Sequence, residues 1–209
     1  MRDLIVVGAS AGGVEALRDL AAGLPPDLPA SVLVVLHLPA GGRSVLPAIL
    51  ERAGPLPART ARDATRPAHG SINVAPPDQH LLVVGARMVL SAGPPEHGRR
   101  PAIDALFRSA ALAAGARVIG VLLSGVLDDG VAGLKTIARH GGTVMVQDPA
   151  EALYPNMPTN AIDALTVDHV LRAGDMGPVL AQLSRQEIDS AGRDDMLAAA
   201  DRGQPEERP

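Results

Sequence analysis

Short, continuous apolar runs alternate along the chain with segments whose apolar residues recur at helical spacing. Such runs are typical of strands buried on both faces of a parallel sheet. The predicted strands are residues 4–7, 32–36, 118–123 and 143–146. The predicted helices are residues 14–22, 44–52, 103–112, 131–139 and 158–164. This alternation predicts an α/β fold with a doubly wound, mostly parallel sheet and helices on both faces.

One region and one terminus depart from this pattern. Between residues 55 and 95 the apolar runs are short (72–74, 81–84 and 88–90), and Gly85-Ala86-Arg87 separates the last two. This spacing predicts an antiparallel hairpin, either inserted into the sheet or appended to it. After about Leu183 the chain becomes polar. We therefore expect one domain over residues 1–184 and a polar tail over 185–209 that is disordered or partly helical, with a helical piece near 196–200.

Composition and charge exclude several classes of function. The chain has 209 residues, and Phe107 and Tyr154 are its only aromatic residues, which argues against a stacking platform for single-stranded nucleic acid. With a net charge of −4, the chain lacks the excess of basic residues that is typical of proteins that bind duplex nucleic acid, so we expect no nucleic-acid partner. Without cysteine there is no thiol nucleophile and no thiolate metal site. The four-residue apolar run at the N-terminus is too short to span a membrane, so we expect a cytoplasmic protein without membrane insertion.

A serine lies in a glycine-rich turn directly after the first predicted strand, in the segment Gly8-Ala9-Ser10-Ala11-Gly12-Gly13. Glycines allow a sharp turn that brings backbone N–H groups close to a bound oxygen, so the turn suits a nucleophile and part of an oxyanion hole. Two other interpretations remain open, a turn that binds dinucleotide phosphates and a simple helix cap. The dinucleotide fingerprint counted from Gly8 requires a glycine where this chain has Ser10.

A histidine ends the second predicted strand. The first two strands of a doubly wound sheet are usually neighbours, so His37 is expected near Ser10, where an imidazole can accept the serine proton. The remaining histidines have no cluster of chemical partners in the sequence and no helical metal-site spacing, and they are His69, His80, His97, His140 and His169. We expect neither a metal nor an organic cofactor.

An aspartate follows the strand at 118–123 and precedes a predicted helix. Asp129 is a candidate third member of a triad that orients the imidazole, or a helix N-cap, a role that Asp128 fits equally well. The order serine, histidine, aspartate differs from the Ser, Asp/Glu, His order of α/β-hydrolases.

Taken together, these segments resemble the catalytic domain of the chemotaxis CheB family, the protein-glutamate methylesterases. The resemblance extends from about Leu4 to Leu183, and its motifs lie at residues 8–13, 37–39, 72–76, 93–95, 101–107, 123–130, 147–148 and 157–158. It implies a parallel doubly wound fold with a hairpin and a serine hydrolase that removes methyl groups from glutamate methyl esters of chemoreceptors, releasing methanol. Many members also deamidate receptor glutamines. The implied partner is the cytoplasmic domain of a methyl-accepting chemoreceptor.

The resemblance also assigns roles to residues of this sequence. Ser10 matches the nucleophile, His37 the general base and Asp129 the orienting acid. The backbone groups that it makes candidates for the oxyanion hole and its supporting turn are those of Ala11, Gly12 and Val126.

The chain departs from the family pattern at three motifs. Ala11 replaces a threonine, and the family loop T-G-M-G-x-D-G has Ser124, Val126 and Leu127 in place of its threonine, methionine and second glycine. Leu127 is expected to shift the loop if that position needs a positive φ. The segment 97–101 replaces the common N-R-H-R-P and is expected to alter substrate recognition. These changes leave a second hypothesis open, a catalytically weakened module that binds receptor tails or a signalling partner.

Familiar members of the family carry an N-terminal receiver domain that controls the active site. This chain begins three residues before its first predicted strand. We therefore expect a stand-alone member without a receiver in cis, controlled by a separate receiver or kinase.

Overall fold

The computed structural model describes residues 1–37 and 44–188. Residues 38 and 39 of the predicted histidine motif lie outside these ranges. So do residues 189–209, which include most of the predicted tail and the predicted helical piece near 196–200.

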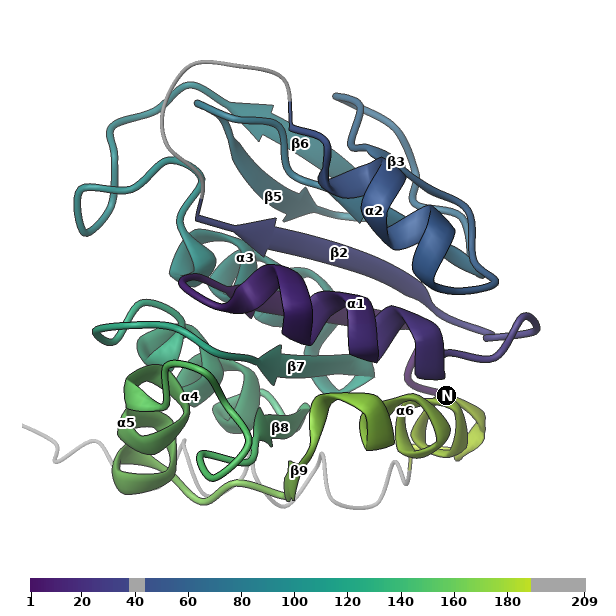
Figure 1. Cartoon of the computed structure of the whole chain (residues 1–209). Coiled ribbons are helices and arrows are strands. Elements are labelled where there is room, and N and C mark those ends of the chain that lie inside the picture. Colours follow the sequence, from purple (N-terminus) through teal and green to yellow (C-terminus); the bar gives the residue numbers. More distant parts are fainter. Residues whose placement is uncertain (38–43, 189–209) are drawn as a thin grey trace, which may run out of the picture.

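Seven parallel strands form one sheet in the order β3-β4-β2-β1-β7-β8-β9 (Figure 1). The strands are β1 (Leu4–Ala9), β2 (Ser31–Leu36), β3 (Ala58–Thr60), β4 (Ser71–Val74), β7 (Val118–Leu122), β8 (Thr143–Gln147) and β9 (His169–Leu171). From the central strand β1 the chain builds outward first on the β2 side and later on the β7 side. This confirms the doubly wound topology, and it places the reversal of strand order at β1, where such sheets form their binding crevices.

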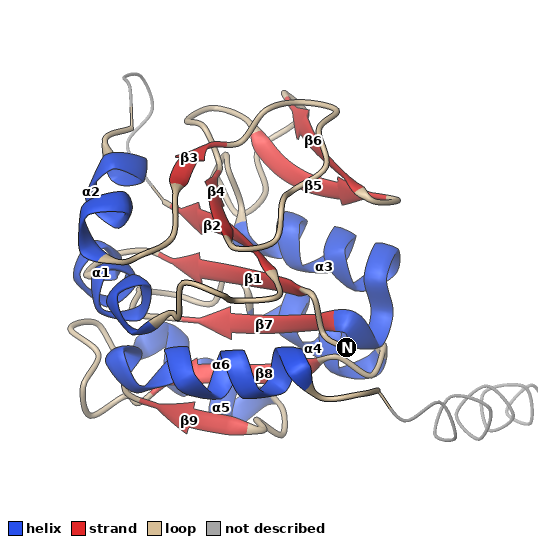
Figure 2. Ribbon diagram, turned by 90° about the vertical axis from the view of Figure 1, so that its right-hand side faces the viewer, coloured by secondary structure: helices blue, strands red, loops and turns tan. Residues whose placement is uncertain are grey.

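Helices cover both faces of the sheet (Figure 2). One face carries α1 (Gly13–Gly23), α2 (Leu46–Ala53) and α6 (Met176–Arg185), and the other carries α3 (Ile103–Ala114), α4 (Val131–Arg139) and α5 (Asn156–Ala164). Two 3₁₀ turns are η1 (Gly115–Arg117) and η2 (Ala173–Asp175). Alternate residues of β1 enter opposite cores, with Ile5 and Val7 on the α1 side and Leu4 and Val6 on the α3 side. Burial on both faces explains the continuous apolar runs of the sequence.

The predicted hairpin is present as β5 (His80–Val84) and β6 (Arg87–Ser91), with Gly85 in the turn at φ 58°. It forms a separate two-stranded sheet, so the alternative of an insertion into the main sheet is wrong. Residues of both strands belong to the same buried cluster as Phe107 of α3, which anchors the hairpin on that side of the molecule. The run 72–74, which resembled the hairpin strands in length, belongs instead to β4 of the parallel sheet.

Three elements were not predicted, and the reason differs among them. The edge strands β3 and β9 have three residues each, which is too short for a periodic pattern to be detected. Helix α6 could have been predicted from the sequence, because its apolar residues Met176, Leu180 and Leu183 recur at helical spacing, and all three are buried.

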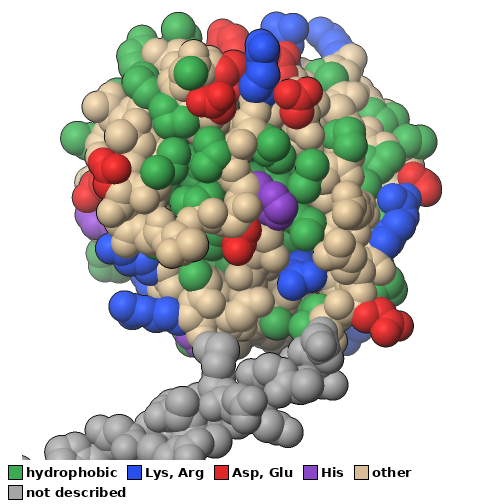
Figure 3. Space-filling model, turned by 90° about the horizontal axis from the view of Figure 1, so that it is seen from below, with side chains coloured by type: hydrophobic (Ala, Val, Ile, Leu, Met, Phe, Trp, Pro, Cys, Tyr) green, Lys and Arg blue, Asp and Glu red, His purple; other side chains and the backbone are tan. Residues whose placement is uncertain are grey.

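The surface of the described residues carries mixed charge. On the face that Figure 3 shows, basic and acidic side chains lie near one another around the margin, with apolar side chains spread between them. Among the helices of residues 1–37 and 44–188, none combines the length and the hydrophobicity needed to cross a bilayer.

Candidate active site

The parallel register brings the predicted serine and histidine together. Ala9 of β1 pairs with Leu36 of β2, and the backbone N–H of His37 donates to the carbonyl of Ala9 at 3.1 Å. Ser10 and His37 are therefore the first residues beyond two adjacent strand ends. Asp129 approaches from the loop between β7, the other neighbour of β1, and α4.

The side chains of Ser10, His37 and Asp129 form one hydrogen-bonded chain. The Ser10 Oγ lies 3.1 Å from His37 Nδ1, and His37 Nε2 lies 2.7 Å from Asp129 Oδ2. The His37 and Asp129 side chains are only 6% and 5% exposed. Because a carboxylate only accepts hydrogen bonds, Nε2 carries the imidazole proton, and Nδ1 is left to accept the hydroxyl proton of Ser10.

The turn that holds Ser10 depends on its glycines and on the loop after β7. The Ser10 N–H donates to the carbonyl of Ser124 at 2.9 Å, and the Gly13 N–H donates to the carbonyl of Ser10 at 2.9 Å. Gly12 has φ 69°, and a Cβ there would lie 2.8 Å from Ser124 Oγ. The N-cap of α1 is Gly12, with no side-chain cap, and the Ser10 hydroxyl faces His37. The hypothesis that Ser10 is a simple helix cap is therefore wrong.

Asp129 is fixed by the N-terminus of α3. Its Oδ2 accepts the backbone N–H of Ile103 at 2.8 Å, and its Oδ1 accepts that of Asp104 at 2.9 Å. Asp129 therefore caps α3, whereas the predicted capping of α4 is wrong: the N-cap of α4 is Gly130. The neighbouring side chain of Asp128 is exposed.

The hydrogen bonds of Asp129 determine its ionisation. Burial alone raises the pKa of its carboxyl group, but the bonds from His37 and from the N–H groups of Asp104 and Ile103 outweigh burial and hold the pKa below its usual value. The carboxylate form next to His37 is thus the stable one.

The backbone groups expected to bind an oxyanion lie beside Ser10. Within residues 1–37 and 44–188, the N–H groups of Ala11, Gly12 and Val126 make no hydrogen bond to a protein acceptor. Gly125, next to Val126, lies so close to the serine that a Cβ on it would be 2.8 Å from Ser10 Cβ. Both segments that carry these N–H groups therefore lie next to the serine.

Hydrogen bonds from neighbouring segments hold the altered loop after β7. Ser124 is fully buried, and its Oγ donates to the Ala11 carbonyl at 2.8 Å and accepts the Tyr154 N–H at 3.0 Å. Leu127 adopts φ 67°, so the condition under which we expected the leucine to shift the loop, a positive φ at this position, is met. The Asn160 side-chain amide donates to the Leu127 carbonyl at 2.8 Å. The leucine thus accepts the strained conformation, and Asp129 keeps its hydrogen bond to His37.

Two residues near the triad were misjudged from the sequence. His97 was expected to lack chemical partners, but its Nδ1 lies 3.7 Å from Asp104 Oδ2 and 3.8 Å from Asp129 Oδ1. Asp104 was not singled out from the sequence as a residue near the site, yet it is 1% exposed. A readable signal existed for Asp104, because it lies three residues before Phe107, on the side of the predicted helix that enters the core.

The ligand atoms of His97, Asp104 and Asp129 all lie within 4.8 Å of one another. Both oxygens of Asp129 and one oxygen of Asp104 already accept backbone N–H groups, which leaves few lone pairs for a cation. The arrangement suits an imidazole facing two carboxylates better than a metal site. Burial and the nearby charge of Asp129 raise the pKa of Asp104, against the opposing effects of the Gly133 N–H and of His97.

Comparisons with known proteins identify relatives of this fold. The family model described as CheB methylesterase matches residues 5–180. The crystal structure of the Thermotoga maritima CheB methylesterase catalytic domain superposes with a TM-score of 0.83 at 29% identity, covering 88% of this chain and 99% of that one.

Curated relatives extend the similarity. A protein-glutamate methylesterase/protein-glutamine glutaminase 3 from Anaeromyxobacter dehalogenans is 44% identical over 170 residues, which are 80% of this chain and 50% of the relative. A protein-glutamate methylesterase/protein-glutamine glutaminase from Ralstonia nicotianae is 39% identical over 186 residues, 87% of this chain and 49% of the relative. The chain spans about half the length of these relatives. By the match of its family model over most of the fold, the chain belongs to the CheB methylesterase family.

Proposed function

We propose that the protein is a serine carboxylic-ester hydrolase that removes methyl groups from glutamate methyl esters of chemoreceptors, releases methanol, and also deamidates receptor glutamines. The observation that carries this proposal is the hydrogen-bonded chain Ser10–His37–Asp129 at the carboxyl ends of adjacent parallel strands. The names of the curated relatives support both the ester and the amide substrate.

In the acylation step, Ser10 Oγ attacks the carbonyl carbon of the methyl ester while His37 Nδ1 takes the hydroxyl proton. The tetrahedral intermediate collapses when His37 returns this proton to the departing methoxide, so methanol leaves and an acyl-serine remains. Water then attacks the acyl-serine with His37 as base, and the products are a free glutamate carboxylate and regenerated Ser10. Asp129 holds the Nε2–H tautomer and stabilises the imidazolium.

The oxyanion of each tetrahedral intermediate requires donors beside Ser10. We assign this role to the backbone N–H groups of Ala11 and Val126, with Gly12 supporting the turn; their lack of other protein acceptors among the described residues supports the assignment. Deamidation uses the same groups, with ammonia in place of methanol as the leaving group.

The substrate that we propose is the cytoplasmic domain of a methyl-accepting chemoreceptor, and the protein acts in the cytoplasm. A receiver or a kinase is proposed to regulate it. The competing hypothesis of a module without turnover receives no support from the loop at 124–130, because Asp129 retains its hydrogen bond to His37 despite Leu127.

The decisive experiment measures methanol release from a receptor fragment whose glutamates carry radiolabelled methyl esters. Wild type should release methanol, Ser10→Ala should not, and Ser91→Ala should match wild type because its hydroxyl lies on β6 and accepts the Gly93 N–H. A fluorophosphonate probe should label wild type and Ser91→Ala but not Ser10→Ala. Absence of both methanol release and labelling in folded wild type would refute the hydrolase and favour the binding module.

A further inference from the structure

A buried carboxylate that the proposed reaction does not touch lies behind the triad. Asp104 is 1% exposed, and its Oδ1 accepts the backbone N–H groups of Gly133 at 2.6 Å and of Gly130 at 3.0 Å. Burying a carboxylate is unfavourable unless hydrogen bonds and opposite charge compensate it. Here the compensation comes from the N-terminal end of α4, where unpaired N–H groups concentrate partial positive charge.

Asp104 and Asp129 each accept backbone N–H groups at the start of the helix that the other acid adjoins. Asp104 belongs to α3 and accepts N–H groups at the start of α4, whereas Asp129 directly precedes α4 and accepts the N–H groups of Ile103 and Asp104 at the start of α3. The start of α3 is therefore capped by Asp129, which lies just before α4, and the start of α4 is capped by Asp104 of α3. Because the bonds close a ring, Asp129 cannot move relative to α3 without breaking bonds at both helix ends.

The packing of α3 on α4 makes this ring tight. Gly133 has no side chain, and a Cβ there would contact Phe107 Cβ and lie 3.0 Å from Asp104 Oδ1. The glycine therefore lets the Asp104 carboxylate reach the α4 backbone directly.

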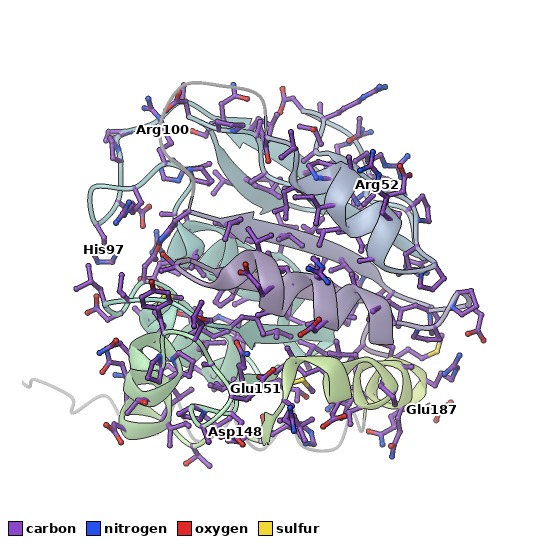
Figure 4. All side chains as sticks on the ribbon, viewed as in Figure 1. Arg52, His97, Arg100, Asp148, Glu151 and Glu187 are labelled. Atoms are coloured by element: carbon purple, nitrogen blue, oxygen red, sulfur yellow. The ribbon has the colours of Figure 1, made fainter. Side chains whose placement is uncertain are left out.

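The outer side of the ring faces an exposed imidazole. The His97 side chain is 55% exposed, and its Nδ1 lies 3.7 Å from the remaining oxygen of Asp104, Oδ2. Figure 4 shows His97 on the loop between β6 and α3, at the end of the molecule where β1 and β2 end. The neighbouring acid, Glu96, forms an ion pair with Arg108, with 2.8 Å between Glu96 Oε1 and Arg108 Nη2. His97 is thus an exposed imidazole that faces the Asp104 carboxylate from outside the ring.

We propose that Asp104 is a positioning residue of the hydrolase: by holding the N-terminus of α4 it sets the distance and angle between Asp129 and His37. The inference rests on the proposed function. It predicts an effect on the chemical step rather than on substrate binding, because Asp104 lies behind Asp129 and the proposed mechanism gives it no contact with substrate.

The test compares Asp104→Ala with Asp104→Asn on the methylated receptor fragment, with kcat and KM measured separately and active molecules counted by fluorophosphonate titration. Asparagine keeps an oxygen acceptor for the α4 N–H groups, and alanine removes it. We expect Asp104→Ala to lower kcat about 10- to 100-fold with KM within about twofold, as for a displacement of the order of 1 Å in a catalytic group. Asp104→Asn should recover most of this loss.

A matched control separates positioning from stability. Asp168 also accepts a backbone N–H, that of Val144 at 2.7 Å, but at the amino end of β8, on the opposite edge of the sheet from the triad. Asp168→Ala should lower thermal stability and leave kcat unchanged. Equal kcat in Asp104→Ala, Asp168→Ala and wild type would overturn the inference.

A pH profile keeps the inference testable if Asp104→Ala does not fold. Asp104→Asn removes the carboxyl group whose charge is coupled to that of Asp129, so the acid limb of its kcat/KM profile should differ from that of wild type, and a superimposable profile would overturn the inference. If wild type itself shows no Ser10-dependent hydrolysis, the proposed function fails instead. The two failures are therefore distinguishable.

Discussion

The substitution Gly133→Ala sets two physical effects of opposite sign against each other. Glycine inside a helix costs about 1 kcal/mol relative to alanine, so helix propensity alone predicts that the variant is more stable. The new methyl group, however, would contact Phe107 Cβ and lie 3.0 Å from Asp104 Oδ1. In a well-packed core such overpacking costs about 1–3 kcal/mol.

The methyl group also affects a hydrogen bond. Gly133 donates its N–H to the Asp104 carboxylate at 2.6 Å, and a hydrogen bond to a charged group contributes about 1.5–3 kcal/mol. If α3 and α4 separate to admit the methyl group, most of this contribution is lost. Overpacking and the lost bond exceed the gain in propensity, so we expect the free energy of unfolding to fall by about 1.5–5 kcal/mol.

Urea denaturation followed by circular dichroism measures this difference. For a chain of this size the loss corresponds to a fall of about 3–20 °C in Tm. Gly174→Ala is the matched control, since a Cβ at Gly174 meets nothing within 4 Å and the residue has no positive φ. The control should be neutral or stabilised by up to about 1 kcal/mol. A Gly133→Ala protein as stable as the control would refute the close approach of the two helices.

Three further predictions concern the loop at 124–130. Ser124→Ala should lower the free energy of unfolding by about 1–3 kcal/mol in urea titrations, because the Ala11 carbonyl and the Tyr154 N–H lose their partner; an unchanged midpoint would contradict the buried bonds. Since the pKa of Asp129 lies below 3.8, its carboxylate stabilises the fold above that pH, and this contribution is lost as the pH falls through the lowered pKa. The stability difference between wild type and Asp129→Asn should therefore shrink below about pH 4; a constant difference in acid denaturation would argue against the lowered pKa. Leu127→Gly should leave kcat/KM for a small ester unchanged, because glycine adopts φ 67° without strain and the leucine side chain is 67% exposed; a tenfold loss would show that the side chain itself serves the reaction.

The sheet and most helices could be predicted because each strand that is buried on both faces leaves a continuous apolar run. The proximity of Ser10 and His37 followed from the same pattern, since consecutive strands of such a sheet are usually neighbours. The edge strands β3 and β9 leave no comparable pattern, because three residues cannot display a period.

The surroundings of Asp129 were not predictable from local sequence. The backbone N–H groups that bind it come from α3, which precedes it in the chain, and local capping rules favour a role at α4 instead. Likewise, His97 meets Asp104 and Asp129 only because the loop after β6 folds back over the start of α3. Contacts of this kind depend on the packing of whole elements rather than on spacing along the chain.

The position of β1 at the centre of the sheet has a consequence for the order in which the protein is made. Ser10 and His37 directly follow the first two strands of this sheet in chain order, whereas Asp129 follows His37 by 92 residues. At about 5–20 residues per second, these residues take about 5–18 seconds to be translated. During that interval β1 has β2 beside it but lacks β7, and a nascent chain has a serine and a histidine without the acid that orients them. The proposed triad is therefore incomplete until the second half of the sheet has been made.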